Sequence, residues 1–327
     1  MRQAKKPTES ISLQERDVAL LKSLFESRVM TTAHVASLFF GGKKEGAKKR
    51  LQKLKADGLV SERVRRAFEP SLLFLAPKGL LVLKERGALR EFPSLPQETL
   101  QRRTVVSPIT LAHELEVMDV KAAFHSAIRG TKTFSVAEFT TWPLLNRFTA
   151  RRPGREGEEV LVKPDGFVRI HETEADDGLS EHTFFLELDR STETLDTLVS
   201  RALCYLDYYK SGNFAVKNGG KPTAFREYPF RVLMVFKTAE RRNNIAEQLV
   251  RNNPPVLTRA CLSTQDEAMK NPLGAIWVTP ADYRTTVKGT AFDPESREPQ
   301  SGYQRQTARD VWIEKKVPKR SLFAEEG

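Results

Sequence analysis

The sequence predicts an α/β protein, α+β overall, in which a small basic domain precedes a larger domain built on a mixed β-sheet. Residues 1–108 hold 22 lysines and arginines against 11 acids, whereas the other 31 basic residues are matched by 31 acids. The hydrophobic period changes from helical to strand-like within the first domain, and the second domain combines helices with apolar strands. A proline-containing stretch separates the two. We therefore expect a first domain at 10–90, a linker at 91–108, a second domain at 109–282 and an extended or disordered tail at 283–327.

The composition indicates a globular chain and argues against several other classes. Of its 327 residues, 39% are hydrophobic and 29% are charged, which is typical of a chain that buries a core. The basic start has no apolar stretch behind it, as a signal peptide would, and no run reaches the roughly 18 apolar residues of a membrane span. Two cysteines without a CxxC pattern are typical of a reducing compartment. We expect a cytoplasmic protein with no membrane partner.

Three helices are predicted in the first 60 residues. A capping box at Ser12–Glu15 favours the start of the first helix, and Thr31 or Thr32 can cap a short second one. The third helix starts at the "KK" of residues 43–44 and stops at Gly58. Its apolar positions recur at steps of four and three and fall on one face: Ala47, Leu51 and Leu54.

Two short strands and a fourth helix follow. Residues 59–64 and 71–77 are strand-like runs joined by a turn that carries Arg65 and Arg66, and residues 77–87 form the closing helix. Three helices, a two-stranded wing and one more helix are the elements of a winged helix-turn-helix. In this arrangement the third helix enters the major groove of double-stranded DNA, and the wing lies against backbone phosphates.

The predicted third helix carries the chemistry that DNA binding needs. Between residues 43 and 55 it holds seven basic residues against one acid, and lysine supplies positive charge for phosphates. Gln52 is suited to read a base edge, with adenine as its usual partner. We expect DNA binding that requires no cofactor, with tight specificity reached through a homodimer or several half-sites. The predicted contacts are Lys43, Lys44, Lys48, Lys49, Gln52, Lys53, Lys55, Arg65 and Arg66.

The second domain is predicted to contain a mixed sheet flanked by helices. Its elements follow the order α-β-β-β-α-β-α-β, which is typical of that architecture. In chain order they are a helix at 109–130, strands at 133–140, 159–170 and 182–190, a helix at 191–210, a strand at 229–238, a helix at 239–253 and a last strand at 274–280.

Three acids lie within the apolar strands of this domain. Asp165 follows Pro164, and Glu187 and Asp189 are two residues apart, so they face the same side of one strand. One hypothesis is a magnesium site, because Mg²⁺ takes hard oxygen ligands. The other is structural: Asp165 belongs to a turn, and the other two acids are paired with nearby arginines.

Three tyrosines on the helix at 191–210 suggest a different chemistry. Tyr205, Tyr208 and Tyr209 could supply the nucleophile of a relaxase. A relaxase also needs clustered histidine ligands for a metal, and the histidines of this sequence do not have such a spacing. At helical spacing, tyrosines are more typical of core or rim residues.

The order of strands and the motifs "PD" and "ExD" resemble the PD-(D/E)xK nuclease core, a restriction-endonuclease-like α/β fold. In that family the PD acid and the first acid of the next strand hold Mg²⁺, so the resemblance implies Asp165 and Glu187 as metal ligands. Asp189 stands where the family has its lysine, and Glu114 or Glu116 could add a third acid. The catalytic set that the resemblance implies for an active enzyme is Asp165, Glu187, Asp189 and Glu114.

Segments spread along the chain are similar to the replication-relaxation family of plasmids and other mobile elements. They are "ERDVALLKSL", "KRLQKLKADGLV" and "FLAPKGL" in the first domain, and "HELEVMDVKAAF", "KPDGFV", "FFLELDRSTETLDTLVSRALCYLDYY" and "VLMVFKTAERRNNI" in the second. The resemblance implies a DNA-binding accessory or regulatory protein in replication, relaxation or transfer. Its second domain would dimerise or dock replication or relaxase complex proteins. A Mg²⁺-dependent endonuclease or nickase using Asp165 and Glu187 is the alternative.

Overall fold

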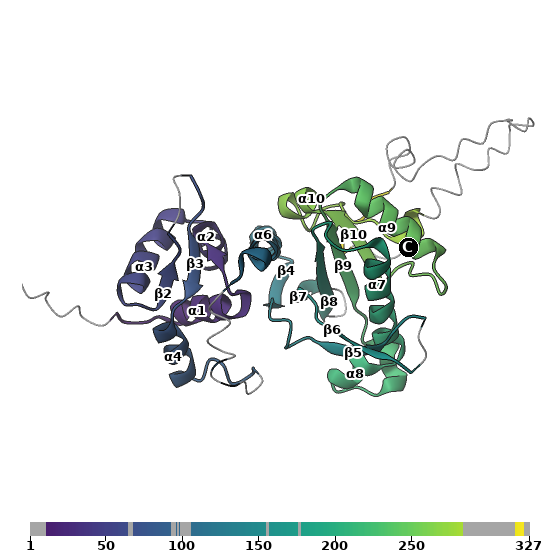
Figure 1. Cartoon of the computed structure of the whole chain (residues 1–327), viewed down its shortest axis with the longest axis horizontal. Helices are drawn as coiled ribbons and strands as arrows, with labels where there is room; N and C mark the ends of the chain where they lie inside the picture. Colours follow the sequence, from purple (N-terminus) through teal and green to yellow (C-terminus); the bar gives the residue numbers. More distant parts are fainter. Residues whose placement is uncertain are drawn as a thin grey trace, which may run out of the picture. The chain divides into compact units, whose positions relative to one another are not determined.

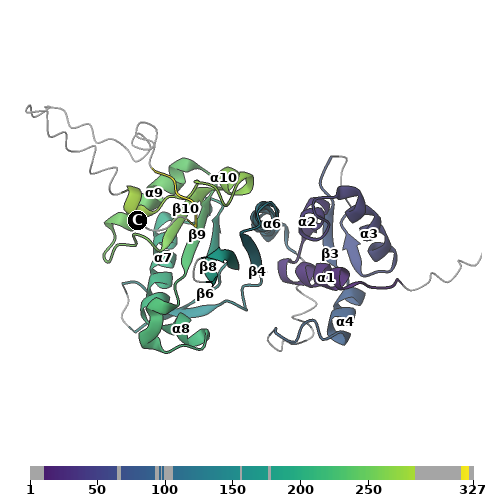
Figure 2. The same ribbon diagram turned by 180° about the vertical axis from the view of Figure 1, so that it is seen from behind.

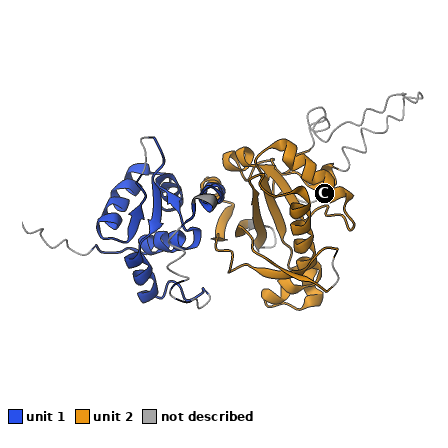
Figure 3. Ribbon diagram, in the orientation of Figure 1, with its two compact units in different colours: residues 1–122 blue, residues 123–327 orange. Residues whose placement is uncertain are grey.

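The computed structural model describes residues 11–64, 68–92, 96, 98, 106–154, 157–175, 178–283 and 318–323. The chain forms two compact units, residues 1–122 and 123–327 (Figure 3). The boundary between them falls within helix α6 (Pro108–Arg129). Within the described ranges, no helix combines the length and the apolar character that crossing a membrane requires.

The first unit combines helices with a small sheet (Figure 1). Its elements before α6 are α1 (Glu15–Ser27), β1 (Met30–Thr31), α2 (Thr32–Phe39), α3 (Lys44–Ala56), β2 (Val60–Glu62), β3 (Leu72–Leu75) and α4 (Pro77–Glu85). The strands form an antiparallel sheet in the order β1-β3-β2, and Figure 2 shows it from behind together with the helices. Strand β1 was not predicted, because two residues are too few to carry a period.

The predicted helices of the first unit form, with one change at a helix start. The capping box of α1 joins Gln14 and Asp17 and not Ser12–Glu15, because the Gln14 N–H donates to Asp17 Oδ2 over 2.8 Å. Helix α2 is capped as predicted, since the Thr31 hydroxyl accepts a hydrogen bond from the His34 N–H. The apolar face predicted for α3 is buried at all three positions: Ala47, Leu51 and Leu54.

The second unit is built on a five-stranded mixed sheet, which confirms the predicted class of this region. The strand order is β10-β9-β8-β7-β4, with parallel pairs at β8–β9–β10 and antiparallel pairs at β4–β7–β8. After α6 the elements are β4 (Phe134–Thr140), β5 (Phe148–Arg151), β6 (Glu159–Val162), β7 (Gly166–Ala175), β8 (Gly178–Asp189), α7 (Leu195–Lys210), α8 (Asn213–Lys217), the 3₁₀ helix η1 (Pro222–Glu227), β9 (Arg231–Phe236), α9 (Ala239–Arg251), β10 (Ala260–Thr264) and α10 (Gln265–Lys270).

Two predicted strands of this unit are wrong. The run at 159–170 is not one strand: it breaks at Lys163–Asp165, so that β6 pairs with β5 in a separate two-stranded sheet and only β7 joins the main sheet. Proline in the break has no N–H to donate to a strand ladder, which explains the interruption. The last strand of the sheet is β10 and not the predicted run at 274–280, of which Trp277 and Val278 make only isolated bridges.

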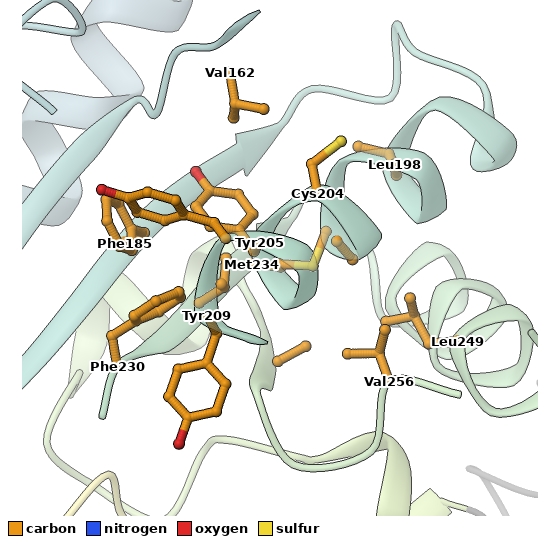
Figure 4. Close-up of a cluster of buried hydrophobic side chains, with 14 of the residues drawn as sticks. Val162, Phe185, Leu198, Cys204, Tyr205, Tyr209, Phe230, Met234, Leu249 and Val256 are labelled. Atoms are coloured by element: carbon orange, nitrogen blue, oxygen red, sulfur yellow. The ribbon is translucent and has the colours of Figure 1, made fainter. Parts of the chain in front are cut away.

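The main core of the second unit lies between the sheet and the helices α7 and α9. Phe185 of β8 packs against Tyr205 of α7 with ring centroids 5.2 Å apart (Figure 4). Tyr205, Tyr208 and Tyr209 are all buried in this cluster, as expected for core residues, and burial raises the pKa of Tyr208 to about 12. A phenol that is buried in a core is not accessible to a DNA strand and does not fit the nucleophile of a relaxase.

The opposite face of the main sheet is covered in part by α6 and by residues from the end of the chain. Phe124 of α6 packs edge-on against Phe139 of β4, with centroids 6.0 Å apart. Leu322 is buried, and Phe323 stacks on Phe134 of β4 at 4.2 Å. Residues 318–323 of the predicted tail therefore pack against this unit.

Candidate functional site

Helix α3 presents a strongly basic surface. One face of the helix is buried and carries the apolar residues named above. The side chains on the remaining surface are exposed, and we call this set the α3 basic face: Lys43, Lys44, Lys48, Lys49, Gln52 and Lys53. Glu45 is its only acid and pairs with Lys48 over 2.8 Å. The face therefore carries a clear excess of positive charge.

Arg50 lies outside this face, because it is used to fix α3 on α1. Its guanidinium forms an ion pair with Asp17, whose side chain has no solvent exposure, and it also donates to the Ser12 carbonyl over 2.8 Å. Burial alone would raise the pKa of Asp17, but the hydrogen bonds from Arg50 and the Gln14 N–H prevail and lower it. The pair therefore sets how α3 is turned relative to α1.

The remaining predicted DNA contacts have different surroundings. Lys55 is half-buried and forms an ion pair with Glu62 of β2, which also accepts a hydrogen bond from Ser71. Gln52 lines, with Lys48 and Lys55, a cavity of about 380 Å³ between α3 and the β2–β3 hairpin. Arg65 and Arg66 lie outside the described residues.

Glu114 lies in the first unit and has a partner there. Arg28, just after α1, forms an ion pair with it over 3.3 Å. On the same helix, α6, Asp119 accepts a hydrogen bond from His34 Nε2 over 2.7 Å, and the buried Lys121 lies 3.8 Å from Glu26. These contacts attach α6 to α1 and α2, so Glu114 serves in packing of the first unit.

The other candidate acids lie where β7 begins and β8 ends, beneath α7. Asp165 precedes β7 and accepts a hydrogen bond from the Leu188 N–H over 2.8 Å. Glu187 is 3% exposed, and the Tyr205 hydroxyl donates to its Oε1 over 2.5 Å. Its Oε2 accepts from Arg201 over 3.0 Å. Both oxygens of Glu187 are thus engaged by side chains of α7.

Asp189 is held in the same way by α9. Arg241 forms a two-pronged ion pair with its carboxylate and also donates to the Glu193 carbonyl. The Ser191 N–H donates to Asp189 Oδ1 over 3.1 Å. Arg201 binds the Glu193 carboxylate over 2.8 Å, which links the two clusters. Asp189, which the sequence resemblance aligned with the lysine of the nuclease motif, is therefore a carboxylate paired with an arginine.

The surroundings of Glu187 also differ from those of a metal ligand. Burial and the neighbouring Asp165 carboxylate raise the pKa of Glu187 to about 8, although Arg201 and Tyr205 act in the other direction. A carboxyl whose ionisation is disfavoured by burial and whose two oxygens already accept from Arg201 and Tyr205 does not fit Mg²⁺, which takes ionised carboxylates and keeps several waters. Across the described ranges, no three histidine, cysteine or acidic side chains are grouped so as to hold a metal ion.

The partners of these acids were not identified from the sequence. Arg201 and Tyr205 are four residues apart on α7, so they lie on the same side of the helix, and this spacing was the available signal. Arg241 is 52 residues from Asp189, and nothing local in the sequence connects the two.

Fold and site together define a mixed α/β protein with a basic helical unit and a second unit whose strand acids are paired internally. The family model described as replication-relaxation matches residues 21–223. The chain therefore belongs to the replication-relaxation family. No curated protein and no solved structure matches it.

Proposed function

We propose that this protein is a DNA-binding accessory or regulatory protein of a plasmid or other mobile element, acting in replication, relaxation or transfer. The observation that carries the proposal is the α3 basic face, in which lysines surround the exposed Gln52 on a helix whose other face is buried. Membership of the replication-relaxation family supports a role linked to such elements.

The arrangement of the first unit supports binding through α3. Helices α1 to α3 followed by the β2–β3 hairpin have the order of a winged helix, in which the third helix enters the major groove. Lys48, Lys49 and Lys53 would contact phosphates, and Gln52 would contact a base edge. Double-stranded DNA is the partner that this combination fits.

The second unit serves, in this proposal, to dimerise or to dock proteins of a replication or relaxase complex. The internal pairing of Glu187 and Asp189 favours this role over DNA cleavage, because both acids already have cationic partners. In the sequence resemblance to the PD-(D/E)xK core, Asp189 stands where the motif has its lysine, which also favours docking over cleavage.

Neutralising three lysines of the α3 basic face is expected to weaken DNA binding and to reduce its salt dependence. In Lys48→Ala/Lys49→Ala/Lys53→Ala, the slope of log affinity against log salt concentration should decrease in magnitude by about 2 to 3. Each phosphate contact contributes roughly 0.9 to this slope. Fluorescence anisotropy with labelled duplex DNA at several salt concentrations measures this.

The matched control removes the same charge from the second unit. Lys132→Ala/Lys237→Ala/Lys270→Ala changes three exposed lysines and should leave the slope close to that of the wild type. Equal slopes for both triple variants would show that binding follows net charge alone and would contradict the assignment to α3.

A cleavage assay separates the proposed role from that of a nuclease. We expect supercoiled DNA to remain intact with Mg²⁺, Mn²⁺ or EDTA, for the wild type as for Asp165→Ala and Glu187→Ala. Gel electrophoresis after incubation reads the outcome. Metal-dependent nicking by the wild type that both variants lack would refute the docking role and establish the acids as a metal site.

A further inference from the structure

A second basic site lies in the second unit, far along the sequence from α3. It is a cavity of about 760 Å³ between the end of α7, the 3₁₀ helix η1 and the loop that leads into β10. Its lining includes two aromatic residues, Tyr209 and Phe225, and three cations, Lys210, Arg226 and Arg259. None of the described residues that line it is an acid.

Two of these cations are available to a ligand. Lys210 and Arg226 are exposed, and neither forms an ion pair or hydrogen bond with another described residue. The nearest interaction of Arg226 is with the Phe225 ring, 5.7 Å from the guanidinium carbon to the centroid. Without an acid in the wall to neutralise them, these two cations favour an anionic ligand.

The third cation is held as a flat platform. The guanidinium carbon of Arg259 lies 3.8 Å from the centre of the Tyr209 ring, which is a stacking distance, and its Nη1 donates to the Phe230 carbonyl over 3.2 Å. Arg259 and Tyr209 both line the cavity, so the stacked pair forms part of its wall.

Tyr209 is itself fixed by the core. Its ring meets Phe225 at 5.2 Å and Phe230 at 5.7 Å, both edge-on. Figure 4 shows it at the margin of the buried cluster, with its hydroxyl directed away from Phe185 and Tyr205. The platform is therefore rigid before any ligand arrives, which reduces the entropic cost of binding.

We propose that this cavity binds an unpaired nucleotide, with the base stacked on the Arg259 guanidinium and the phosphates held by Lys210 and Arg226. Nucleobases stack on arginine planes as well as on aromatic rings, and phosphates take lysine and arginine as partners. The nucleotide can come from single-stranded DNA or from a free nucleotide, and the site is separate from the α3 basic face. It gives the protein a contact to single strands beside its proposed contact to duplex DNA.

The test uses the full-length chain with the three α3 lysine substitutions, so that binding by α3 is suppressed. Binding of a labelled twelve-residue oligothymidylate is measured by anisotropy, alongside saturation-transfer NMR with thymidine monophosphate. In this background Arg259→Lys keeps the positive charge but removes the planar guanidinium on which the base is proposed to stack. We therefore expect roughly tenfold weaker binding of the oligonucleotide. Arg226→Ala, at an exposed position, should weaken it as well, and Arg251→Ala is the matched control.

The choice of control makes the outcome specific. Arg251 is exposed and pairs with Glu247 within α9, and it does not line the cavity. If thymidine monophosphate gives a signal, a mononucleotide is sufficient for binding to the cavity. If only the oligonucleotide binds, the ligand of the cavity is a single strand. Unchanged affinity for the oligonucleotide in both Arg259→Lys and Arg226→Ala would overturn the proposal. It would also be overturned if polyglutamate displaced the labelled oligonucleotide as well as the unlabelled oligonucleotide does. Duplex binding is measured separately, in the chain that keeps the α3 lysines. A failure of the single-strand test therefore does not count against the proposed duplex contact.

Discussion

Asp17→Ala is expected to lower the free energy of unfolding of the first unit by about 3 kcal/mol. The substitution leaves the Arg50 guanidinium without its main partner in a largely buried position, and removing one member of a buried ion pair costs several kcal/mol. It also leaves the Gln14 N–H without the acceptor that closes the start of α1. Urea unfolding followed by far-ultraviolet circular dichroism measures the change.

The sequence supplies a probe that separates the two units in this experiment. The three tryptophans are Trp142, Trp277 and Trp312, so residues 1–122 contain none. Tryptophan emission reports the second unit alone, and its midpoint should stay unchanged in Asp17→Ala. A control, Asp57→Ala, removes the partner of the exposed Lys78 and should cost less than about 1 kcal/mol. Equal effects of the two substitutions would contradict a special role for the Asp17–Arg50 pair.

The second unit is expected to lose stability as the pH rises from about 4.5 to about 8. The pKa of Glu187 rises from 4.5 to about 8 on folding, mainly through burial, so the folded state holds a proton that the unfolded state has released. The stabilisation is complete below pH 4.5 and is lost as the pH rises through 8, by an amount on the order of 5 kcal/mol. Urea midpoints from tryptophan emission across this range measure it.

Glu187→Gln should flatten this pH dependence. The amide resembles the protonated carboxyl in shape and has no charge. Its oxygen can still accept from Arg201, and its NH2 can donate to the Tyr205 hydroxyl, so the contacts persist without a titrating group. Glu159→Gln, an exposed position on β6, makes the same chemical change and should leave the slope as in the wild type. A Glu187→Gln variant with an undiminished slope would assign the pH dependence to other groups.

The sequence predicted the helices of the first unit because apolar residues recur at helical spacing over about two turns and capping residues mark helix starts. Leu21, Leu24 and Phe25 of α1 are buried at the expected spacing. Short elements escaped prediction: β1 has two residues, and β10 is a five-residue strand buried at every position, so it has no alternation to detect. The break between β6 and β7 could have been expected from Pro164, which interrupts the run.

The candidate site was predicted less completely than the fold. That Glu187 and Asp189 share one face followed from the two-residue period of a strand. Which groups meet them depends on how α7 and α9 lie over the sheet, and that is set by the packing of Phe185, Tyr205 and their neighbours. Arg201 and Arg241 therefore could not be chosen from among the many arginines of the sequence.

Helix α3 keeps the positions that fold it apart from the positions that it exposes. The inward positions are Ala47, Leu51, Leu54 and the ion-paired Arg50. The outward positions are Lys48, Lys49, Gln52 and Lys53. Substitutions among the outward positions are therefore expected to change the charge and shape of this surface without disturbing a core contact. A library randomised at the outward positions would therefore vary the exposed surface of α3 in a chain that is expected to keep its fold.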